Sequence, residues 1–181
     1  MLEIRWHGRG GQGAVTSVEM LALTAIGEGK YAQGFPSFGP ERRGAPVSAF
    51  NRIDDKKIKV RSAVYNPDAV VVLDSSLVSL VNVTEGLKPD GALIVNTPKP
   101  PQELKKEINF KGRVATVDAS KIAWEELGVP ITNTTMLGAL IRVLDIVKLD
   151  SLQAPIENRF GRIAQKNLTA LKRAHQEVRI T

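Results

Sequence analysis

Three short, continuous apolar runs in the middle of the chain constrain its fold most. Ala69–Leu73, Ala92–Val95 and Val114–Val117 are each followed by a polar residue. Such runs are typical of parallel strands that are buried on both faces. Helical patterns lie between them. Strands that alternate with helices predict an α/β fold, with a mostly parallel sheet covered by helices on both faces.

The rest of the chain extends this pattern. Strands are predicted at Leu2–Trp6 and Lys30–Phe35. Helices are predicted at Ala14–Glu28, Ser75–Leu87, Gln102–Glu107 and Ser120–Leu127. From Pro130 onward the chain is predicted to be helical: from Thr132 or Asn133, either of which can cap the helix, to about Val147, then over Leu152–Phe160 and Ile163–Val178.

Two segments with alternating character predict a β-hairpin inserted into this order. Val47–Ile53 and Lys57–Arg61 flank Asp54-Asp55, a pair suited to a turn. The basic residues of the second segment are interpreted as a solvated strand face. No repeat, low-complexity segment or linker interrupts the chain, so residues 1–181 are expected to form a single α/β domain with a helical C-terminal part.

A glycine-rich loop follows the first predicted strand. Gly8, Gly10 and Gly13 have the G-x-G-x-x-G spacing. Glycine permits positive φ and close backbone approach, and a loop that opens onto a helix directs free N–H groups at an anion. The spacing alone leaves three occupants open: a dinucleotide, another phosphate, or a neighbouring protein.

The dinucleotide reading lacks one of its usual elements. The fingerprint needs an acidic residue at the end of the second strand, and Tyr31–Phe35 has none. Arg42 and Arg43 could hold a 2′-phosphate instead. A stand-alone NADP- or nucleotide-binding domain is therefore the alternative function, although no constellation for hydride transfer is present.

The residue types available exclude several kinds of chemistry. The chain has no cysteine, so no thiolate nucleophile and no cysteine-ligated cluster can reside on it. It has two histidines, His7 and His175, and no zinc site is expected. No G-x-S-x-G elbow or Walker lysine occurs. We therefore predict no catalytic residue and no metal ligand. His7 is interpreted as a structural partner of the loop, and Asp74 either as a helix cap or as a ligand-facing group.

The charge balance favours acidic or phosphorylated partners. The formal net charge is +6, but aromatic residues are few and do not flank the basic runs. Nucleic-acid binding is not expected. No apolar run is long enough to cross a membrane, and the first residues lack a secretory pattern. These features predict a cytoplasmic protein with no membrane partner.

Two long motifs carry a resemblance to a known family. His7–Gly13 and Phe35–Val47, together with Asn133–Ala139, resemble the gamma subunit of 2-oxoacid:ferredoxin oxidoreductases, and the pyruvate enzymes most of all. The likeness covers nearly the whole chain. It implies an α/β accessory subunit of a complex that oxidatively decarboxylates a 2-oxoacid, forms acyl-CoA and reduces ferredoxin.

The resemblance also implies the partners and cofactors. Alpha, beta and delta subunits are expected, with thiamine diphosphate, Mg and [4Fe–4S] clusters on them and no cofactor on this chain alone. Coenzyme A is a substrate of the complex. The residues expected in interface or ligand-binding loops are Gly8, Arg9, Gly10, Gly11, Gln12, Gly13, Phe38, Gly39, Glu41, Arg42, Arg43, Asn133 and Thr134. Packing on the thiamine-binding subunits is favoured over contact with coenzyme A.

Overall fold

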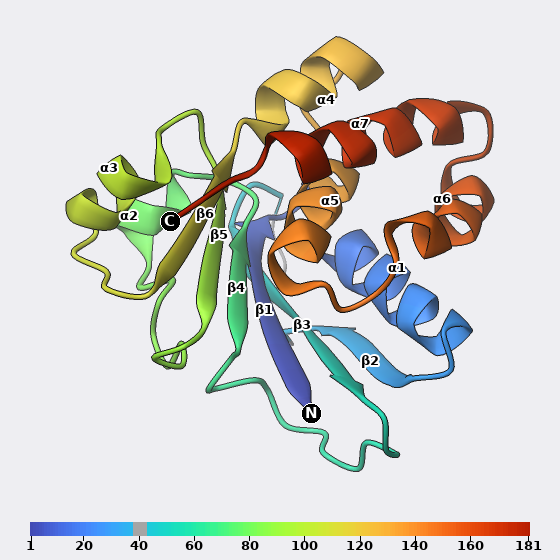
Figure 1. The fold of residues 1–181 in the computed structure, drawn as a ribbon, viewed down its shortest axis with the longest axis horizontal. Helices are drawn as coiled ribbons and strands as arrows, with labels where there is room; N and C mark the ends of the chain where they lie inside the picture. Colours follow the sequence, from blue (N-terminus) through green and yellow to red (C-terminus); the bar gives the residue numbers. More distant parts are fainter. Residues whose placement is uncertain (38–42) are drawn as a thin grey trace.

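A seven-stranded sheet forms the centre of the molecule (Figure 1). The computed structural model describes residues 1–37 and 43–181. The strand order is β2-β3-β1-β4-β5-β6-β7. Its strands are β1 Leu2–Arg9, β2 Tyr31–Pro36, β3 Pro46–Asp54, β4 Ala69–Val72, β5 Ala92–Asn96, β6 Arg113–Val117 and β7 Arg179–Ile180. The four central strands β1, β4, β5 and β6 are parallel, whereas β2, β3 and β7 are antiparallel additions at the two sides.

Helices cover both faces of this sheet, as predicted (Figure 1). On one face lie α1 Ala14–Gly27, α4 Ala119–Leu127, α5 Asn133–Leu144, α6 Gln153–Phe160 and α7 Ala164–Glu177. The other face carries the short helices α2 Leu77–Leu80 and α3 Pro101–Glu107. Two apolar cores result, the larger under α1, α5 and α7 and the smaller under α2 and α3. Side chains alternate between these cores along β4 and β5, which is why both strands read as uninterrupted apolar runs.

Buried hydrogen bonds hold α1 against the antiparallel side of the sheet. The indole Nε1 of Trp6, which is fully buried, donates to Asn51 Oδ1 at 2.9 Å. Asn51 Nδ2 in turn donates to the Val18 carbonyl at 2.8 Å and to the Gln33 carbonyl at 3.3 Å. A Cβ at Gly34 would lie 2.5 Å from the same Val18 oxygen, so only glycine lets α1 approach β2 this closely.

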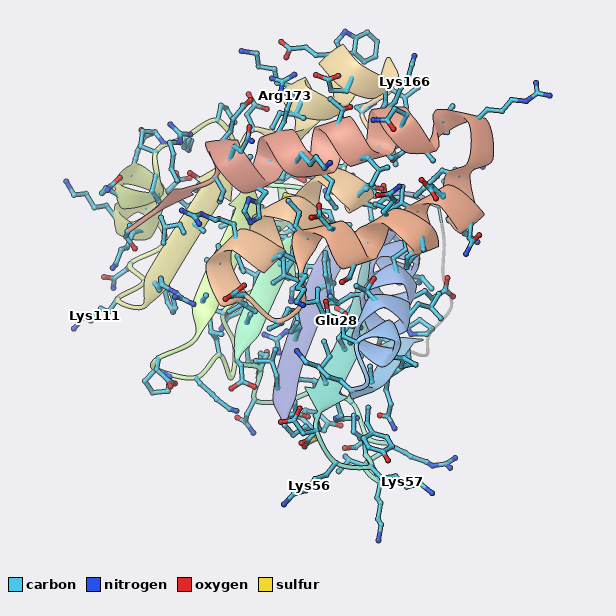
Figure 2. The ribbon with its side chains drawn as sticks, turned by 45° about the vertical axis from the view of Figure 1, so that its right-hand side comes forward. Glu28, Lys56, Lys57, Lys111, Lys166 and Arg173 are labelled. Carbon is cyan, nitrogen blue, oxygen red and sulfur yellow. The ribbon has the colours of Figure 1, made fainter. Side chains whose placement is uncertain are left out.

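The predicted hairpin is wrong in its second strand. β3 pairs with β1 on one side and with β2 on the other, so no edge of β3 is free to pair with Lys57–Arg61. That segment is an irregular connection instead. Figure 2 shows Lys56 and Lys57 projecting from the end of the molecule where this connection begins. The antiparallel insertion is formed by β2 and β3.

The helix predicted over Ser75–Leu87 is also wrong beyond its first turn. α2 ends at Leu80, and Val81 is extended. The irregular backbone that follows is held by Arg5, whose Nη2 donates to the carbonyls of Val83 and Glu85. Those carbonyls accept from a buried guanidinium instead of from helical N–H groups, while Val83 still enters the smaller core.

The remaining helices are confirmed within a few residues, and β7 was not predicted. β7 pairs with β6 at the edge of the sheet, and its two residues carry too little pattern to be found from sequence. Within the described residues, no helix combines the length and apolar character needed to cross a membrane.

Candidate functional site

The glycine loop turns sharply between β1 and α1. Gly11 and Gly13 have φ values of 95° and 84°, a region that other residues adopt rarely. Gly13 is also the N-cap of α1 and offers no side chain to cap it. The turn itself is closed by the main chain of Gln12, whose N–H donates to the Arg9 carbonyl at 3.0 Å. Gly13, the last glycine of the G-x-G-x-x-G spacing, and Gly11 between its members thus meet a real conformational requirement.

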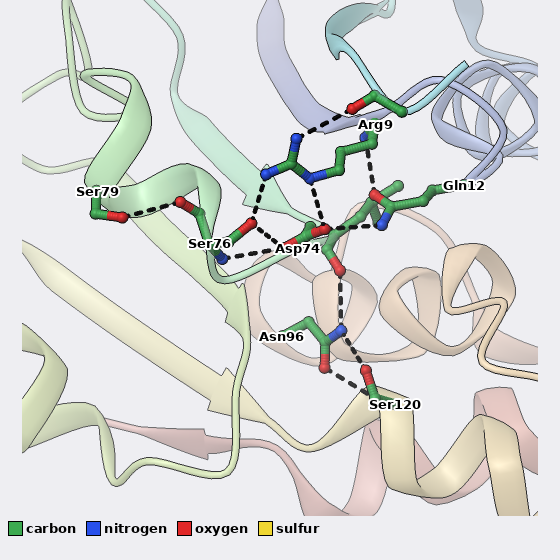
Figure 3. Close-up of polar contacts among 9 residues, drawn as sticks. Arg9, Gln12, Asp74, Ser76, Ser79, Asn96 and Ser120 are labelled. Atoms are coloured by element: carbon green, nitrogen blue, oxygen red, sulfur yellow. Dashed lines mark hydrogen bonds and ion pairs between the residues drawn. The ribbon is translucent and has the colours of Figure 1, made fainter.

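Side chains of the loop itself and of Asp74, which follows β4, hold the loop closed (Figure 3). Gln12 Oε1 accepts from the Arg9 N–H at 2.8 Å, and Gln12 Nε2 donates to Asp74 Oδ2 at 2.9 Å. Arg9 Nε donates to the same Asp74 oxygen at 3.0 Å. The other carboxylate oxygen accepts from the N–H and the hydroxyl of Ser76. Asp74 therefore joins the loop to the end of β4.

The loop of the second family motif, Phe35–Val47, contacts the glycine loop through Gly44 and Ala45. Gly10 N–H donates to the Ala45 carbonyl at 2.9 Å, and Gly44 N–H donates to the Gly10 carbonyl at 3.1 Å. Arg9 Nη1 also donates to the Gly44 carbonyl. Arg43 pairs with Gly10 in an isolated bridge, and its side chain is exposed. Phe38, Gly39, Glu41 and Arg42 lie outside the described residues.

Asn133 and Thr134 lie at the start of α5, directly against the glycine loop. A Cβ at Gly13 would be 2.6 Å from Asn133 Nδ2, so the two residues are in close contact. The Asn133 carbonyl accepts from Ser17 Oγ in α1 at 3.3 Å. Asn133 Oδ1 accepts from the Thr134 N–H at 2.8 Å within the first turn of α5, whereas the N-cap residue Thr132 makes no side-chain capping bond. These contacts bring a distant part of the sequence to the site, and both side chains are buried.

Further polar residues continue this network across the sheet edge, and sequence reasoning missed their connection (Figure 3). Asn96 Nδ2 donates to the Leu73 carbonyl and to Ser120 Oγ, both at 2.9 Å. Ser120 N–H donates back to Asn96 Oδ1 at 3.1 Å. The available signal was positional, because Asp74 and Asn96 each stand at the end of a buried strand.

The carboxylate of Asp74 is held in its charged form. Burial raises its pKa, but the hydrogen bonds from Ser76 and Gln12 and the charge of Arg9 outweigh this and lower it below the ordinary value. One oxygen of Asp74 accepts from Ser76, the N-cap residue of α2, and the other accepts from Arg9 and Gln12. That Asp74 faces a ligand stays a prediction. A negative charge at this position disfavours a phosphate beside the glycines.

His7 is part of the strand that leads into the loop and is not available as an acid or base. Burial and the nearby charge of Arg5 lower its pKa to about 4, so the ring is neutral at pH 7. Arg5 Nε donates to His7 Nε2 at 3.1 Å, which requires that nitrogen to be unprotonated. The proton is then on Nδ1, which faces Ser48 Oγ at 3.5 Å. The side-chain partners of His7 are therefore Arg5 on β1 and Ser48 on β3, and not the glycine loop that the sequence predicted.

A crevice of about 300 Å³ lies at the carboxyl ends of the parallel strands. Its polar lining includes Gln12, Asp74, Asn96 and Asp118. In open α/β sheets this is the usual place for a ligand. Here Gln12 and Asp74 are engaged with each other. The arrangement can hold the loop rigid, and it presents two carboxylates where a dinucleotide would place its pyrophosphate.

Removing the carboxylate of Asp74 is expected to loosen the glycine loop. Asp74→Ala deletes the acceptor of Arg9, Gln12 and Ser76, and we expect amide hydrogen exchange at Gly10–Gly13 to rise at least about tenfold, with a stability loss of about 1–3 kcal/mol. Asp118→Ala is the matched control. It removes the cap of α4, where Asp118 accepts from the Lys121 N–H, at the same sheet edge. Loop exchange that is equal in the two variants would contradict the role given to Asp74.

Among residues 1–37 and 43–181, no group of three or more histidine, cysteine, aspartate or glutamate side chains is placed to hold a metal ion.

Comparison with known proteins gives concordant matches over the whole length. The family model described as pyruvate ferredoxin/flavodoxin oxidoreductase matches residues 3–177. The pyruvate/ketoisovalerate oxidoreductases common subunit gamma of Thermococcus kodakarensis is 54% identical, over 96% of this chain and 95% of its own.

Solved structures share the fold. Pyruvate oxidoreductase subunit PORC from Thermotoga maritima superposes with a TM-score of 0.89 at 46% identity, covering 99% of this chain and 98% of that one. A 2-oxoglutarate:ferredoxin oxidoreductase from Magnetococcus marinus, solved with 2-oxoglutarate, coenzyme A and succinyl-CoA bound, has a TM-score of 0.79 at 21% identity. The match covers 97% of this chain but 30% of that chain. The same fold therefore also occurs as one part of a longer polypeptide.

Proposed function

This chain belongs to the pyruvate ferredoxin/flavodoxin oxidoreductase family as a gamma subunit, and we propose that its glycine loop is the surface on which partner subunits pack. The complex oxidatively decarboxylates a 2-oxoacid, transfers the acyl group to coenzyme A and reduces ferredoxin. In this proposal the gamma subunit contributes a rigid docking surface and none of the reacting groups. The alternative of a stand-alone NADP- or nucleotide-binding domain has no support, because the matched relatives are oxidoreductase subunits over nearly their full length.

The residues present in this chain support an assignment of the cofactors to the partner subunits. Without cysteine it has no thiolate ligand for an iron–sulfur cluster. The half-buried His7 and the ion-paired Asp74 are both engaged in structural contacts. We therefore place thiamine diphosphate, Mg and the [4Fe–4S] clusters on alpha, beta and delta subunits in the cytoplasm, with ferredoxin reduced through the complex. Residues 1–181 act as a single α/β domain in this scheme.

The choice of oxoacid is proposed to lie outside this chain. The Thermococcus relative is named as the subunit common to a pyruvate and a ketoisovalerate oxidoreductase. Those two oxoacids differ in the size of the side chain next to the reacting carbonyl. A gamma subunit that serves both cannot form the walls that distinguish them. With pyruvate as the first substrate to test, the specificity pocket is assigned to the thiamine-binding subunits.

One observation carries the proposal for the glycine loop: the side chains of Arg9 and Gln12 are already engaged in contacts within this chain. Arg9 makes three side-chain hydrogen bonds, to Asp74, Gly44 and Ser76, so it is not a free donor for a phosphate. A loop closed in this way presents a fixed shape, which suits packing against protein. Arg43, exposed beside Gly10, is the described cation best placed to meet a carboxylate of a partner.

Substitution of Arg43 separates an interface role from a coenzyme A role. Arg43→Ala is expected to weaken assembly with the partner subunits about tenfold and to leave the KM for coenzyme A unchanged within the intact complex. Lys111→Ala is the control, since Lys111 is also exposed and projects from a different part of the surface (Figure 2). Subunit dissociation constants and initial rates over a range of coenzyme A concentrations measure both effects. A rise in the KM for coenzyme A with normal assembly would overturn the interface role.

A further inference from the structure

A patch of large apolar side chains is exposed at one end of the helical layer. It is formed by α4, the segment leading into α5, and the turn before α7. Its exposed members are Val129, Ile131 and Ile163, and the half-buried Leu127 and Phe160 line the same cavity. Ile163 is 51% exposed, Ile131 44% and Val129 43%. Single exposed apolar residues are ordinary, but a group of them around one cavity is typical of a protein-binding surface.

The apolar patch surrounds a small cavity. The cavity has a volume of about 100 Å³ and is lined by Leu127, Val129, Ile131, Phe160 and Ile163, with Asn133 and Asn167 beside them. An apolar cavity of about 150 Å³ accommodates a benzene-sized group, so this one suits a single aliphatic side chain. An apolar pocket at the centre of a surface patch is typical of a binding hot spot.

Cations stand at the rim of the apolar patch. Lys166 lines the cavity, and Arg162 precedes Ile163. Neither makes an ion pair with a described residue, in contrast to the nearby Arg173, which contacts Glu125, Glu126 and Glu177. Figure 2 shows Lys166 near the start of α7 and Arg173 further along that helix. An apolar centre with basic residues at its rim complements a partner surface that has the opposite charge.

A buried residue connects the cavity of the apolar patch with the glycine loop. Asn133 lines the cavity and also contacts Gly13. One residue therefore touches both features, although Gly13 and Ile163 are far apart in sequence.

We propose that the apolar patch is a second part of the interface with a partner subunit of the oxidoreductase, and that its cavity receives one apolar side chain of that subunit flanked by carboxylates. This inference rests on the proposed function, since it takes the partner from the same complex. It assigns a binding role to residues that lie outside both family motifs.

Single cysteines test the proposal cleanly because the chain has none of its own. Val129→Cys and Ile163→Cys place a thiol in the patch, and Leu80→Cys places one at a site of similar exposure, 59%, on α2 over the other face. Each variant is co-expressed with the partner subunits. Maleimide labelling of this chain, read by mass after separation of the subunits, is compared between the free chain and the complex.

We expect labelling of Val129→Cys and Ile163→Cys to slow at least about tenfold on assembly, while Leu80→Cys shows that the reagent reaches an exposed thiol. If either patch thiol reacts in the complex as fast as in the free chain, the proposal is overturned. Protection in the isolated chain at high concentration would also overturn it, because the patch would then join two copies of this chain. Failure to assemble with any partner in all variants and in the unmodified chain would instead refute the proposed function.

A charge placed in the patch gives an independent measurement. Ile163→Asp is expected to raise the subunit dissociation constant at least about tenfold, because a carboxylate would replace the apolar contact and repel the carboxylates expected on the partner. Leu80→Asp is expected to leave it unchanged. Thermal unfolding of both variants checks that each remains folded. Equal dissociation constants for folded Ile163→Asp and the unmodified chain would contradict the assignment.

Discussion

Replacing Gly138 with alanine is expected to lower the free energy of unfolding by about 3 kcal/mol, at the upper end of the usual cost of overpacking. Gly138 lies in α5, and a Cβ there would be 2.0 Å from the Leu171 carbonyl oxygen of α7. The obstacle is backbone inside a helix, so it cannot rotate away. α5 is buried at nearly every position between the sheet and α7, which leaves no direction for relief. Urea unfolding of the isolated chain measures the change.

Gly27→Ala is the matched control for this prediction. Gly27 is the last residue of α1, and a Cβ there would have nothing within 4 Å. Alanine at an open helical position is expected to change stability by less than about 1 kcal/mol, in the stabilising direction. Equal stability of the two alanine variants would show that α5 and α7 are further apart than described. The consequence for function is direct, because α5 carries Asn133, and a displaced α5 would move it away from Gly13.

The central strands could be predicted because a strand that is buried on both faces has a recognisable apolar sequence. A strand covered on both faces must be apolar at every position, and Ala69–Leu73 and Ala92–Val95 are. The helices of the larger face were found for a similar reason, since each presents a periodic apolar stripe. These features depend on local sequence alone.

The two wrong secondary-structure predictions share a different cause: contacts with residues far away in the chain decide the backbone conformation there. Lys57–Arg61 alternates well, but β3 already pairs with β1 and β2, and alternation does not reveal which edges are occupied. Likewise, nothing local to Val83 indicates that Arg5 binds its carbonyl. Tertiary contacts override local preference in both places.

The location of the candidate site could be predicted from the sequence, but the hydrogen-bond partners of its residues could not. The glycine spacing identified the turn, whereas the bond from the Gly10 N–H to the Ala45 carbonyl of the second motif was visible only in the structure. The role of Asp74 as the acceptor for Arg9 and Gln12 depends on β4 lying next to β1. Strand order is not readable from spacing, so the sequence identified Arg9 only as a residue of an interface or ligand-binding loop.

Mild acid is expected to destabilise the isolated chain through His7. In the unfolded chain its pKa is near 6.5, and in the folded chain it is about 4. The folded state therefore binds fewer protons between these values, and stability falls as pH falls through this window. The expected loss between pH 7.5 and pH 5 is about 2 kcal/mol. Protonation also removes the acceptor of Arg5 Nε and places two cations side by side.

His7→Gln isolates this effect, because glutamine offers an oxygen acceptor but does not titrate. The pKa of His175 is lowered as well, by burial and by Arg142, so the unmodified chain carries two such contributions. Carboxylates such as Asp74, with lowered pKa values, lose their stabilising contribution only below about pH 4, outside the measured range. Urea unfolding at pH 7.5, 6 and 5 is therefore expected to show a smaller loss for His7→Gln than for the unmodified chain, and His175→Gln provides the comparison. If His7→Gln loses as much stability as the unmodified chain, His7 is protonated in the folded state and the strand that leads into the glycine loop must hold it as a cation.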